Sequence, residues 1–318
     1  MHVALGRGAE FDAIRRLLAR WGDAAQGIGN DTAALDVPPG HRMVASTDTN
    51  IEGVDFRREW LTPSEIGYRA TAAALSDLAA AAASPLGVLL AITVPTNWRE
   101  ALEGVADGAG QAARAAGATV LGGDLTAVTG PGMLALNVTV LGSAPHPITR
   151  TGARVGDHVY VTGVIGGPAR ALRAWLDGTD PQPADRARFA RPAPRIREAQ
   201  WLAERGARAA IDVSDGLVAD VGHIAAASGV RIAIDLGLVP RVSGVTAIDA
   251  AQSGEEYELA VIAPGGIDVS DFAAAFGIPL TDIGHVTEPA STRAGAGVET
   301  YCDGKRVDPP GGYDHFSS

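Results

Sequence analysis

The sequence contains a single cysteine, Cys302, in 318 residues. One thiol cannot form an internal disulfide or a multi-cysteine metal site, so the fold depends on neither. Lysine is equally scarce, because Lys305 is the sole lysine and the other long basic side chains are all arginine. Any phosphate chemistry therefore cannot depend on a P-loop lysine or on the strand lysine of a protein kinase. Lys305 itself follows Asp303-Gly304, which is typical of a hairpin turn.

An excess of basic charge and a long uninterrupted apolar run are also missing. The net charge of −11 argues against a general nucleic-acid binder, which needs a basic face for phosphates. The N-terminal twenty residues lack the apolar core of a signal peptide. Residues 70–94 reach membrane-spanning length, but Asp77, Pro85 and Gly87 interrupt them, and Pro85 is typical of a helix end. We therefore expect a soluble, cytoplasmic protein without a nucleic-acid or membrane partner.

Apolar and polar residues alternate in a way that predicts strands and helices in turn along the chain. The clearest helix start is Thr62-Pro63-Ser64-Glu65, a capping box with proline at the first helical position. Such alternation through both halves indicates α/β layers. A proline-containing segment near 143–149 suggests an N-terminal domain over 1–145 and a C-terminal domain over 146–318. We expect helices at 10–21, from 63, from Thr96 to about 117 and from Pro168, and strands ending at Asp48, at 87–94, at 133–142 and ending at Asp212.

Carboxylates recur where hydrophobic segments end and the chain changes direction, which is the usual place for ligands in α/β proteins. They are Asp31, Asp48, Asp124, Asp212 and Asp215. Asp77 differs because it lies in mid-helix among alanines, where an unpaired charge is costly to bury. Converging carboxylates repel one another unless a cation joins them, and Mg²⁺ prefers oxygen ligands and leaves room for phosphate oxygens.

Each of these features has a structural alternative. Asp31 or Asp215 alone is more often a helix cap than a ligand, and Asp77 could pair with Arg69. The glycine turn at 163–167 is a weak phosphate signal, and the arginine-rich stretch at 186–197 is usually a solvated helix face. Spacing does not decide between these readings.

Taken in order, the segments of this chain resemble the thiamine-monophosphate kinases, a family of the aminoimidazole ribonucleotide synthetase (PurM-like) superfamily. The resemblance covers nearly the whole chain. It rests on the segments GNDTAAL, STDTNIEGVDF, TPSEIGYRATAAALSDLAAAAASP, GGDLT, RTGARVGDHVYVTG, RPAPRI, IDVSDGLVADVGHI, SGEEYEL and the terminal DGKRV and GYDHF. IDVSDGL, EEYEL and GYDHF look most like the thiamine-phosphate branch.

The resemblance implies a PurM-like two-domain α/β fold and a homodimer. The N-terminal domain would bind ATP and metal and pair its sheet with its twin, and the C-terminal domain would complete the nucleotide and substrate site. The implied activity is transfer of the ATP γ-phosphoryl group to thiamine monophosphate, with several Mg²⁺ ions and no side chain acting as acid or base. Metal-binding positions would be Asp31, Ser46, Thr47, Asp48, Asp77, Asp124, Asp212 and Asp215. ATP would contact Gly123, Asp124, Arg150 and Ser214, and the substrate would meet Asp55, Glu255 and Tyr313.

The chain departs from the family pattern at two positions. Asn30 replaces the first acid of a Gly-Asp-Asp loop, although Asp31 remains, and Asp55 replaces a histidine associated with the substrate phosphate. An extra anion at position 55 should repel a phosphate. Two other functions therefore stay open: a superfamily enzyme that uses ATP on a different acceptor, and a non-catalytic nucleotide-binding dimer.

Overall fold

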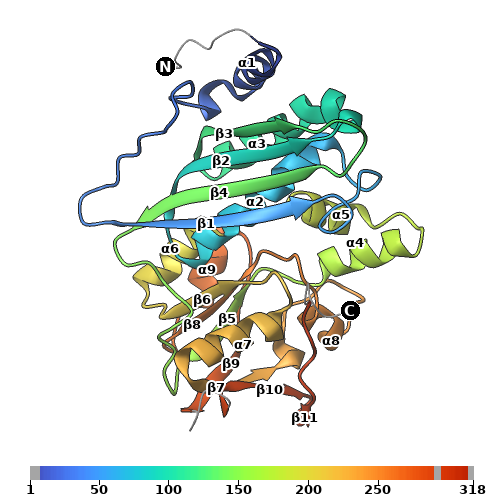
Figure 1. The fold of residues 1–318 in the computed structure, drawn as a ribbon. Helices are drawn as coiled ribbons and strands as arrows, with labels where there is room; N and C mark the ends of the chain where they lie inside the picture. Colours follow the sequence, from blue (N-terminus) through green and yellow to red (C-terminus); the bar gives the residue numbers. More distant parts are fainter. Residues whose placement is uncertain (1–7, 290–294, 314–318) are drawn as a thin grey trace. The chain divides into compact units, whose positions relative to one another are not determined.

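The computed structural model describes residues 8–289 and 295–313 and divides the chain into two compact units (Figure 1). Unit 1 is built from the described residues up to Leu78, Ala83–Pro147 and Ala190–Pro194. Unit 2 is built from Ala79–Ala82, Ile148–Phe189 and the described residues from Arg195 onward. The main crossing between the units thus follows Pro147, two residues after the domain boundary expected at 145. Each unit contains its own sheet and helices, as a mixed α/β fold requires.

Unit 1 combines one four-stranded sheet with three α-helices, joined by two short 3₁₀-helices. In chain order its elements are α1 (Ala9–Trp21), η1 (Gly22–Ala24), β1 (Arg42–Ile51), α2 (Pro63–Ala80), β2 (Ser84–Val94), η2 (Thr96–Ala101), α3 (Leu102–Ala115), β3 (Thr119–Ala127) and β4 (Ala135–Ala144). The sheet order is β1-β4-β2-β3. β4 runs antiparallel to both of its neighbours, and β3 is parallel to β2.

Alternation of buried and exposed residues gives the sheet of unit 1 one covered and one open face. Val138 and Val140 of β4 are fully buried, and Leu78 of α2 lies against Gly142 on the same side. Thr47 and Thr139 point to the other side and join their hydroxyl groups across β1 and β4 at 3.0 Å. The side chains of β1 that flank Thr47 therefore face α2, while Thr47 faces the open side.

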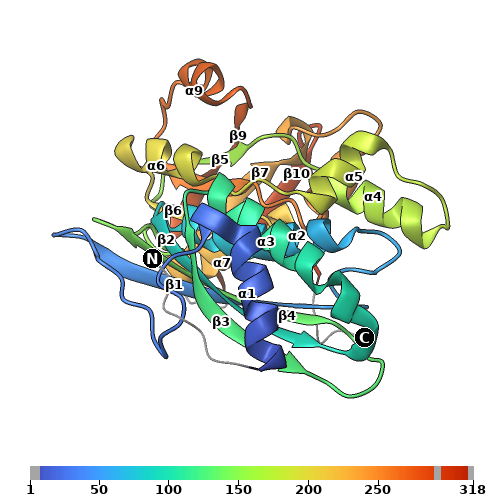
Figure 2. The same cartoon turned by 90° about the horizontal axis from the view of Figure 1, so that it is seen from above.

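Helix α2 starts at the predicted capping box. The Thr62 N–H donates to the Glu65 carboxylate at 2.8 Å, and the Glu65 N–H donates back to the Thr62 hydroxyl at 3.3 Å. α2 and α3 then pack backbone to backbone, because a Cβ added to Gly67 would lie 1.8 Å from the Val105 carbonyl oxygen. α1 lies against α3 through the Trp21 indole N–H, which donates to the Ala106 carbonyl at 2.8 Å (Figure 2).

Two boundary predictions in unit 1 are wrong. Pro85 does not end a helix but lies near the start of β2, where the pairing with β4 shifts register between Pro85 and Gly87. Such a bulge admits a proline into a strand. Thr96 does not cap a long helix either: it is the first residue of η2, and α3 begins only at Leu102. Among the described residues, no helix combines the length and hydrophobicity that crossing a bilayer demands.

Unit 2 is a larger mixed sheet with helices. Its elements are β5 (His158–Thr162), α4 (Gly167–Leu176), α5 (Pro183–Ala190), α6 (Ile196–Glu204), β6 (Ala209–Asp212), α7 (Leu217–Ser228), β7 (Val230–Asp235), η3 (Leu236–Leu238), α8 (Ala247–Ala251), β8 (Leu259–Ala263), α9 (Val269–Phe276), β9 (Leu280–Pro289), β10 (Gly297–Cys302) and β11 (Lys305–Val307). The sheet order is β11-β10-β7-β9-β5-β8-β6. Asp303 and Gly304 connect β10 to β11 with φ of 51° and 72°, as the predicted hairpin turn requires.

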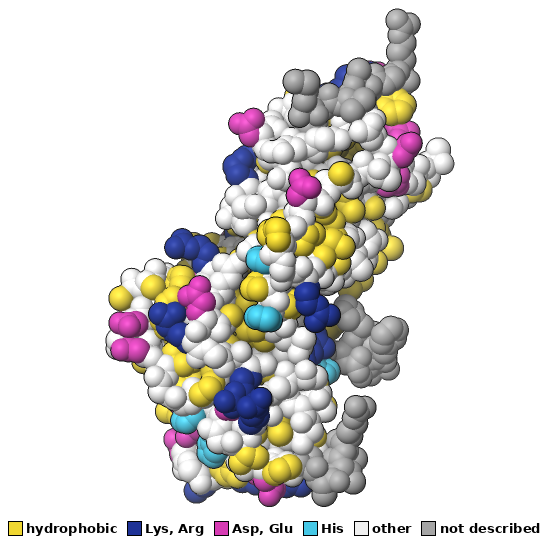
Figure 3. Space-filling model, turned by 90° about the vertical axis from the view of Figure 1, so that its left-hand side faces the viewer, with side chains coloured by type: hydrophobic (Ala, Val, Ile, Leu, Met, Phe, Trp, Pro, Cys, Tyr) yellow, Lys and Arg dark blue, Asp and Glu magenta, His cyan; other side chains and the backbone are white. Residues whose placement is uncertain are grey.

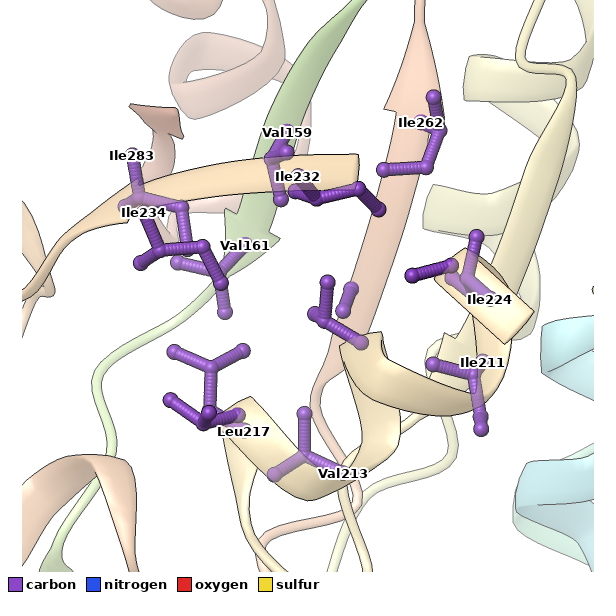
Figure 4. Close-up of a cluster of buried hydrophobic side chains, with 14 of the residues drawn as sticks. Val159, Val161, Ile211, Val213, Leu217, Ile224, Ile232, Ile234, Ile262 and Ile283 are labelled. Atoms are coloured by element: carbon purple, nitrogen blue, oxygen red, sulfur yellow. The ribbon is translucent and has the colours of Figure 1, made fainter. Parts of the chain in front are cut away.

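The hydrophobic core of unit 2 lies between this sheet and α7. Figure 4 shows branched aliphatic side chains from five strands directed toward Leu217 and Ile224 of the helix. Leu217 and Ile224 are fully buried. Burying such side chains stabilises the unit by roughly 1.5–3 kcal/mol each. This packing fixes α7, and with it the segment between β6 and α7 that carries two of the predicted site residues, Ser214 and Asp215.

The composition of the arginine-rich stretch at 186–197 suggested a solvated helix face, but two of its arginines bind buried carboxylates instead. The Arg195 guanidinium donates to both carboxylate oxygens of Glu258, at 2.8 and 2.6 Å, and Arg188 donates to Glu256 at 3.0 Å. Glu256 and Glu258 are 4% and 1% exposed, so these ion pairs are buried on the acidic side. The arginines hold α5 and α6 against the segment that precedes β8.

Candidate active site

In unit 1, Asp77 of α2 is in contact with Ser46 of β1. The Ser46 hydroxyl donates to the Asp77 carboxylate at 2.5 Å, and both side chains are partly buried. Ser46 and Asp48 lie on the face of β1 that α2 covers, since residues two apart on a strand share a face. The structure thus brings together Ser46 and Asp77, and places Asp48 on the same side of the strand.

A second group of predicted residues lines a cavity on the open face of the same sheet. The cavity measures about 1010 Å³ and lies between the sheet, α1 and residues 28–35. Four predicted site residues contribute to its lining: Asp31, Thr47, Gly123 and Asp124. Its size suits a ligand of nucleotide dimensions, because small-molecule sites commonly occupy 300–1,000 Å³. Apolar side chains such as Phe11, Leu89 and Leu141 form the rest of the wall together with Asn137 and Thr139, which sequence patterns did not single out.

The backbone conformation at position 123, beside this cavity, requires a glycine. Gly123 has φ of 154°, and a Cβ there would lie 1.7 Å from the Leu90 carbonyl oxygen of the neighbouring strand. The pairing of β2 and β3 shifts register just before this point, between Val88 and Leu89. The resulting bulge carries Asp124 to an exposed position, where Thr126 donates to its carboxylate at 2.7 Å.

The donor chemistry of these side chains fits a hard divalent cation. The predicted ligands present carboxylate and hydroxyl oxygens, with no histidine or cysteine among them, and such oxygens are what Mg²⁺ prefers. Within the part of the chain that the structure describes, however, three or more acids do not gather closely enough to hold a metal by themselves. Metal binding by Asp31 and by Asp77 therefore stays a prediction: Asp31 lines the cavity, and Asp77 accepts a hydrogen bond from Ser46.

In unit 2, Asp212 is the last residue of β6, and the loop between β6 and α7 carries Ser214 and Asp215. Its backbone is tied to the segment before β8: the Glu255 N–H donates to the Ser214 carbonyl at 2.7 Å. The Tyr313 N–H donates to the Asp215 carbonyl at 2.9 Å. Five predicted residues are thereby collected in one corner of unit 2, although their sequence positions span about a hundred residues. They are Asp212, Ser214, Asp215, Glu255 and Tyr313.

Asp215 does not cap α7, contrary to the capping alternative. The N-cap of the helix is Gly216, without a side-chain cap, and the loop amides find a different acceptor. One oxygen of the Asp220 carboxylate accepts the N–H groups of Ser214, Asp215 and Gly216 at 3.1, 3.2 and 3.1 Å. Burial and the nearby charge of Asp215 raise the pKa of Asp220 to about 7. The three backbone hydrogen bonds have the opposite effect and lower this pKa, but they do not outweigh burial. Sequence patterns missed Asp220, although an acid in the first turn of a helix after Asp-Gly was a usable signal.

The segment before β8 has an unusual backbone. Glu255 and Tyr257 both adopt left-handed conformations, with φ of 62° and 53°. The Tyr257 hydroxyl donates to the Glu255 carboxylate at 2.5 Å. Non-glycine residues with positive φ cost of order 1 kcal/mol or more each and persist where surrounding contacts hold them, often at functional sites. Tyr257 thus orients Glu255, a role that the sequence did not reveal.

The glycine turn at 163–167 is a structural turn. The Gly166 N–H, which could have met a phosphate, donates to the buried Glu256 carboxylate. Burial raises the pKa of Glu256 to about 7, although Arg188, Ser253 and this amide lower it. Space beside the turn is also taken, because a Cβ at Gly163 would lie 2.2 Å from Glu258.

Two further predicted residues, Asp55 and Arg150, make contacts of other kinds within their own units. Asp55 closes a tight turn after β1: its carboxylate accepts the Ile51 N–H at 2.7 Å. Arg150 is exposed and lies near the beginning of β6, where its carbonyl oxygen accepts the Ser228 hydroxyl at 3.1 Å and the adjacent Thr149 pairs with Ala209. The backbone of Arg150 is therefore at the opposite end of β6 from Asp212.

The two units match the two domains of the AIR synthase related proteins. Residues 29–144 match the N-terminal domain of that family, and residues 154–296 match its C-terminal domain. Thiamine-monophosphate kinase of Escherichia coli K12 is 36% identical over 97% of this chain and 96% of its own length. The chain belongs to the thiamine-monophosphate kinase family, as its motifs led us to expect.

Solved structures agree with this assignment. Thiamine-monophosphate kinase from Stenotrophomonas maltophilia K279a superimposes with a TM-score of 0.78 at 32% identity, covering 95% of this chain and 98% of that one. AaThiL complexed with AMPPCP and TMP gives a TM-score of 0.75 at 28% identity, covering 96% of each chain. That relative was therefore captured with both an ATP analogue and TMP.

Proposed function

We propose that this protein transfers the γ-phosphoryl group of ATP to thiamine monophosphate, forming thiamine diphosphate and ADP in the cytoplasm with Mg²⁺ as the cofactor. The observation that carries the proposal is the cavity of unit 1, whose lining includes Asp31, Thr47, Gly123 and Asp124. Full-length similarity to thiamine-monophosphate kinases supports the choice of reaction.

The proposed metal ligands are carboxylate and hydroxyl oxygens. In unit 1 they are Asp31, Ser46, Thr47, Asp48, Asp77 and Asp124, and in unit 2 they are Asp212 and Asp215. Bound Mg²⁺ neutralises phosphate charge and aligns the transferred group. The acceptor is a phosphate that is already ionised near neutral pH, so the protein needs no general base and serves mainly to position the reactants. The chain has no lysine in a phosphate-binding loop, which is consistent with a reaction that depends on metal ions and on the positioning of the reactants.

Gly123, Asp124, Arg150 and Ser214 are the proposed ATP contacts. Gly123 supports this role because it lines the cavity beside Asp124, at a position where glycine allows β3 to approach the Leu90 carbonyl oxygen closely. On the acceptor side we propose Glu255 and Tyr313, an acid and an aromatic ring that suit the cationic ring of thiamine. Tyr257 supports the role of Glu255 by donating a hydrogen bond to its carboxylate.

A homodimer is the proposed assembly, with the open face of the unit 1 sheet as the interface. Met43 of β1 is 57% exposed on the same face as Thr47. Figure 3 shows hydrophobic side chains gathered on the surface of the part of the molecule that contains unit 1. In a dimer, packing of this sheet against the sheet of a second copy would cover these hydrophobic side chains.

The deciding experiment is a coupled assay with ATP, Mg²⁺ and thiamine monophosphate, run beside a panel of other phosphate acceptors. Formation of thiamine diphosphate supports the proposal. Turnover with another acceptor alone would favour a different superfamily enzyme, and nucleotide binding without turnover would favour a non-catalytic dimer.

Position 55 provides a separate test of the acceptor. Asp55→Asn removes the negative charge and keeps an oxygen for the Ile51 N–H, whereas Asp55→His restores the family residue. If the substrate phosphate approaches this turn, we expect both variants to lower KM for thiamine monophosphate, by about 3-fold or more, because a like charge has gone. Unchanged KM in both variants, measured at saturating ATP, would remove Asp55 from the substrate site.

A further inference from the structure

Asp220 occupies a buried position behind the loop of unit 2 that follows Asp212, the last residue of β6, and carries Ser214 and Asp215. It lies in the first turn of α7 and is 1% exposed. Its Oδ2 atom accepts three consecutive backbone N–H groups, from Ser214, Asp215 and Gly216, all between 3.1 and 3.2 Å. Three successive amides directed at one point form the kind of concave donor set that elsewhere binds a phosphate.

Because the protein's own carboxylate fills this donor set, the loop amides are not available to an external phosphate. Whatever the loop does for a ligand must therefore come from its side chains. The directions of those side chains depend on the backbone of 214–216, which Asp220 holds from the amide side. From the carbonyl side, Glu255 and Tyr313 hold the same residues at 2.7 and 2.9 Å.

The loop also has little freedom to find another arrangement. Gly216 has φ of 128°, and a Cβ at Gly254 would lie 2.6 Å from the Ser214 carbonyl oxygen. The facing segment is itself held in left-handed conformations at Glu255 and Tyr257. Removing the Asp220 carboxylate would leave three backbone N–H groups without an acceptor in a tightly packed place. Because unsatisfied donors are costly there, the loop would have to move.

We propose that Asp220 is a positioning residue for nucleotide binding: its carboxylate shapes the 214–216 backbone so that the side chains of Asp212, Ser214 and Asp215 point at the metal–nucleotide complex. The inference rests on the proposed function, because it takes those three residues as ligands of Mg²⁺ and ATP. Asp220 itself touches neither ligand. Its effect is exerted through the loop.

The competing explanation is that Asp220 stabilises the fold and nothing more. Asp157 is a matched control for that explanation. It is 2% exposed, accepts the Arg154 N–H at 2.8 Å and pairs with Arg208. Arg208 directly precedes β6, so this buried acid serves the opposite end of the strand from the Asp212 loop.

The experiment compares Asp220→Asn, Asp220→Ala, Asp157→Asn and Asp157→Ala in the full chain. Binding of the ATP analogue AMPPCP with Mg²⁺ is measured by calorimetry, at a temperature where thermal unfolding shows each variant to be folded. Hydrogen–deuterium exchange is followed over 212–218. Asn keeps one oxygen acceptor without the charge, so it should preserve part of the loop.

We expect Asp220→Ala to weaken Mg·AMPPCP binding about 10-fold or more, with Asp220→Asn intermediate, as for residues that orient metal ligands. KM for ATP should rise in step, and exchange over 212–218 should accelerate. The Asp157 variants should lose thermal stability but keep the affinity within about 2-fold, since they leave the loop intact. If Asp220→Ala does not fold, Asp220→Asn decides the question.

Folded Asp220 variants that bind Mg·AMPPCP as tightly as the wild type would overturn this inference, even if the wild type phosphorylates thiamine monophosphate. Conversely, a wild type that binds the analogue but leaves thiamine monophosphate untouched would overturn the acceptor assignment alone, because the binding comparison still tests Asp220. A wild type that binds no nucleotide would overturn both.

Discussion

Asp77 is the residue whose position most constrains the chemistry of unit 1. It is an acid in the middle of an alanine-rich helix, and Ser46 donates a hydrogen bond to it across the packed face of the sheet. Ser46 and Asp77 thereby place a hydroxyl oxygen and a carboxylate oxygen side by side, and both are ligand types that Mg²⁺ prefers.

We predict that Asp77→Asn and Asp48→Asn each lower kcat by roughly 100-fold or more, because each removes a charge that faces the transferred phosphate through Mg²⁺. Asn retains an oxygen for the Ser46 hydroxyl, so the unfolding temperature of Asp77→Asn should change little. Asp107→Asn is the control, since Asp107 is a helical acid of unit 1 that pairs with Arg20 at the surface. Full turnover in either of the first two variants would contradict the metal-site assignment.

At the scale of elements, the bulge in β3 shows how a strand is bent to serve a site. Gly123→Ala would place a methyl group 1.7 Å from the Leu90 carbonyl oxygen, at a φ of 154°. We expect it to destabilise the protein by about 3 kcal/mol or more, or to displace Asp124 and weaken nucleotide binding, because the backbone contact cannot yield cheaply.

Gly130→Ala is the matched control for Gly123→Ala. Gly130 also has a positive φ, of 93°, but nothing lies within 4 Å of an added Cβ. Its cost should be about 1 kcal/mol, from the backbone conformation alone. Urea unfolding gives the loss in free energy of unfolding for each variant, and the difference between the two losses is the steric cost at Gly123. Equal losses would show that the close approach to Leu90 adds no cost of its own.

Elements with a local chemical signal were predictable from the sequence, and those that depend on distant contacts were not. The capping box at Thr62 and the turn at Asp303 were legible because a few adjacent residues determine them. Pro85 was misread because only its pairing with β4 reveals that a bulge accommodates it. At the site, motif order led us to expect the loop residues as ligands, whereas spacing does not encode the contacts that Asp220 and Tyr257 make with Ser214 and Glu255.

The open face of the unit 1 sheet leads to a prediction about assembly. We expect Met43→Asp to shift the protein from dimer to monomer in sedimentation analysis, because a desolvated charge at an apolar interface is costly. Met133→Asp is the control, since Met133 is 63% exposed but precedes β4 instead of lying on the sheet face. A wild type that sediments as a monomer would contradict the proposed dimer.

At the scale of the whole molecule, the acidity of buried groups couples stability to pH. Glu256 is 4% exposed and accepts hydrogen bonds from Gly166, Ser253 and Arg188. Burial raises its pKa from the ordinary 4.5 to about 7, so the folded protein binds this proton more tightly than the unfolded chain does. The contribution to stability is therefore complete below pH 4.5 and declines as pH rises toward 7.

Glu256→Gln isolates that contribution, because Asp220 titrates in both proteins and cancels in the comparison. The gap between 4.5 and about 7 corresponds to roughly 3 kcal/mol. We expect the variant to match the wild type in free energy of unfolding at pH 5 and to exceed it at pH 8 by up to that amount. The measurement is urea unfolding across this range at constant salt. The opposite result, a variant with a lower free energy of unfolding than the wild type at pH 8, would show that attraction to Arg188 outweighs the cost of burying the charge. In that case the ionised Glu256 carboxylate satisfies the Arg188 guanidinium, and the amide N–H₂ of the variant cannot replace it.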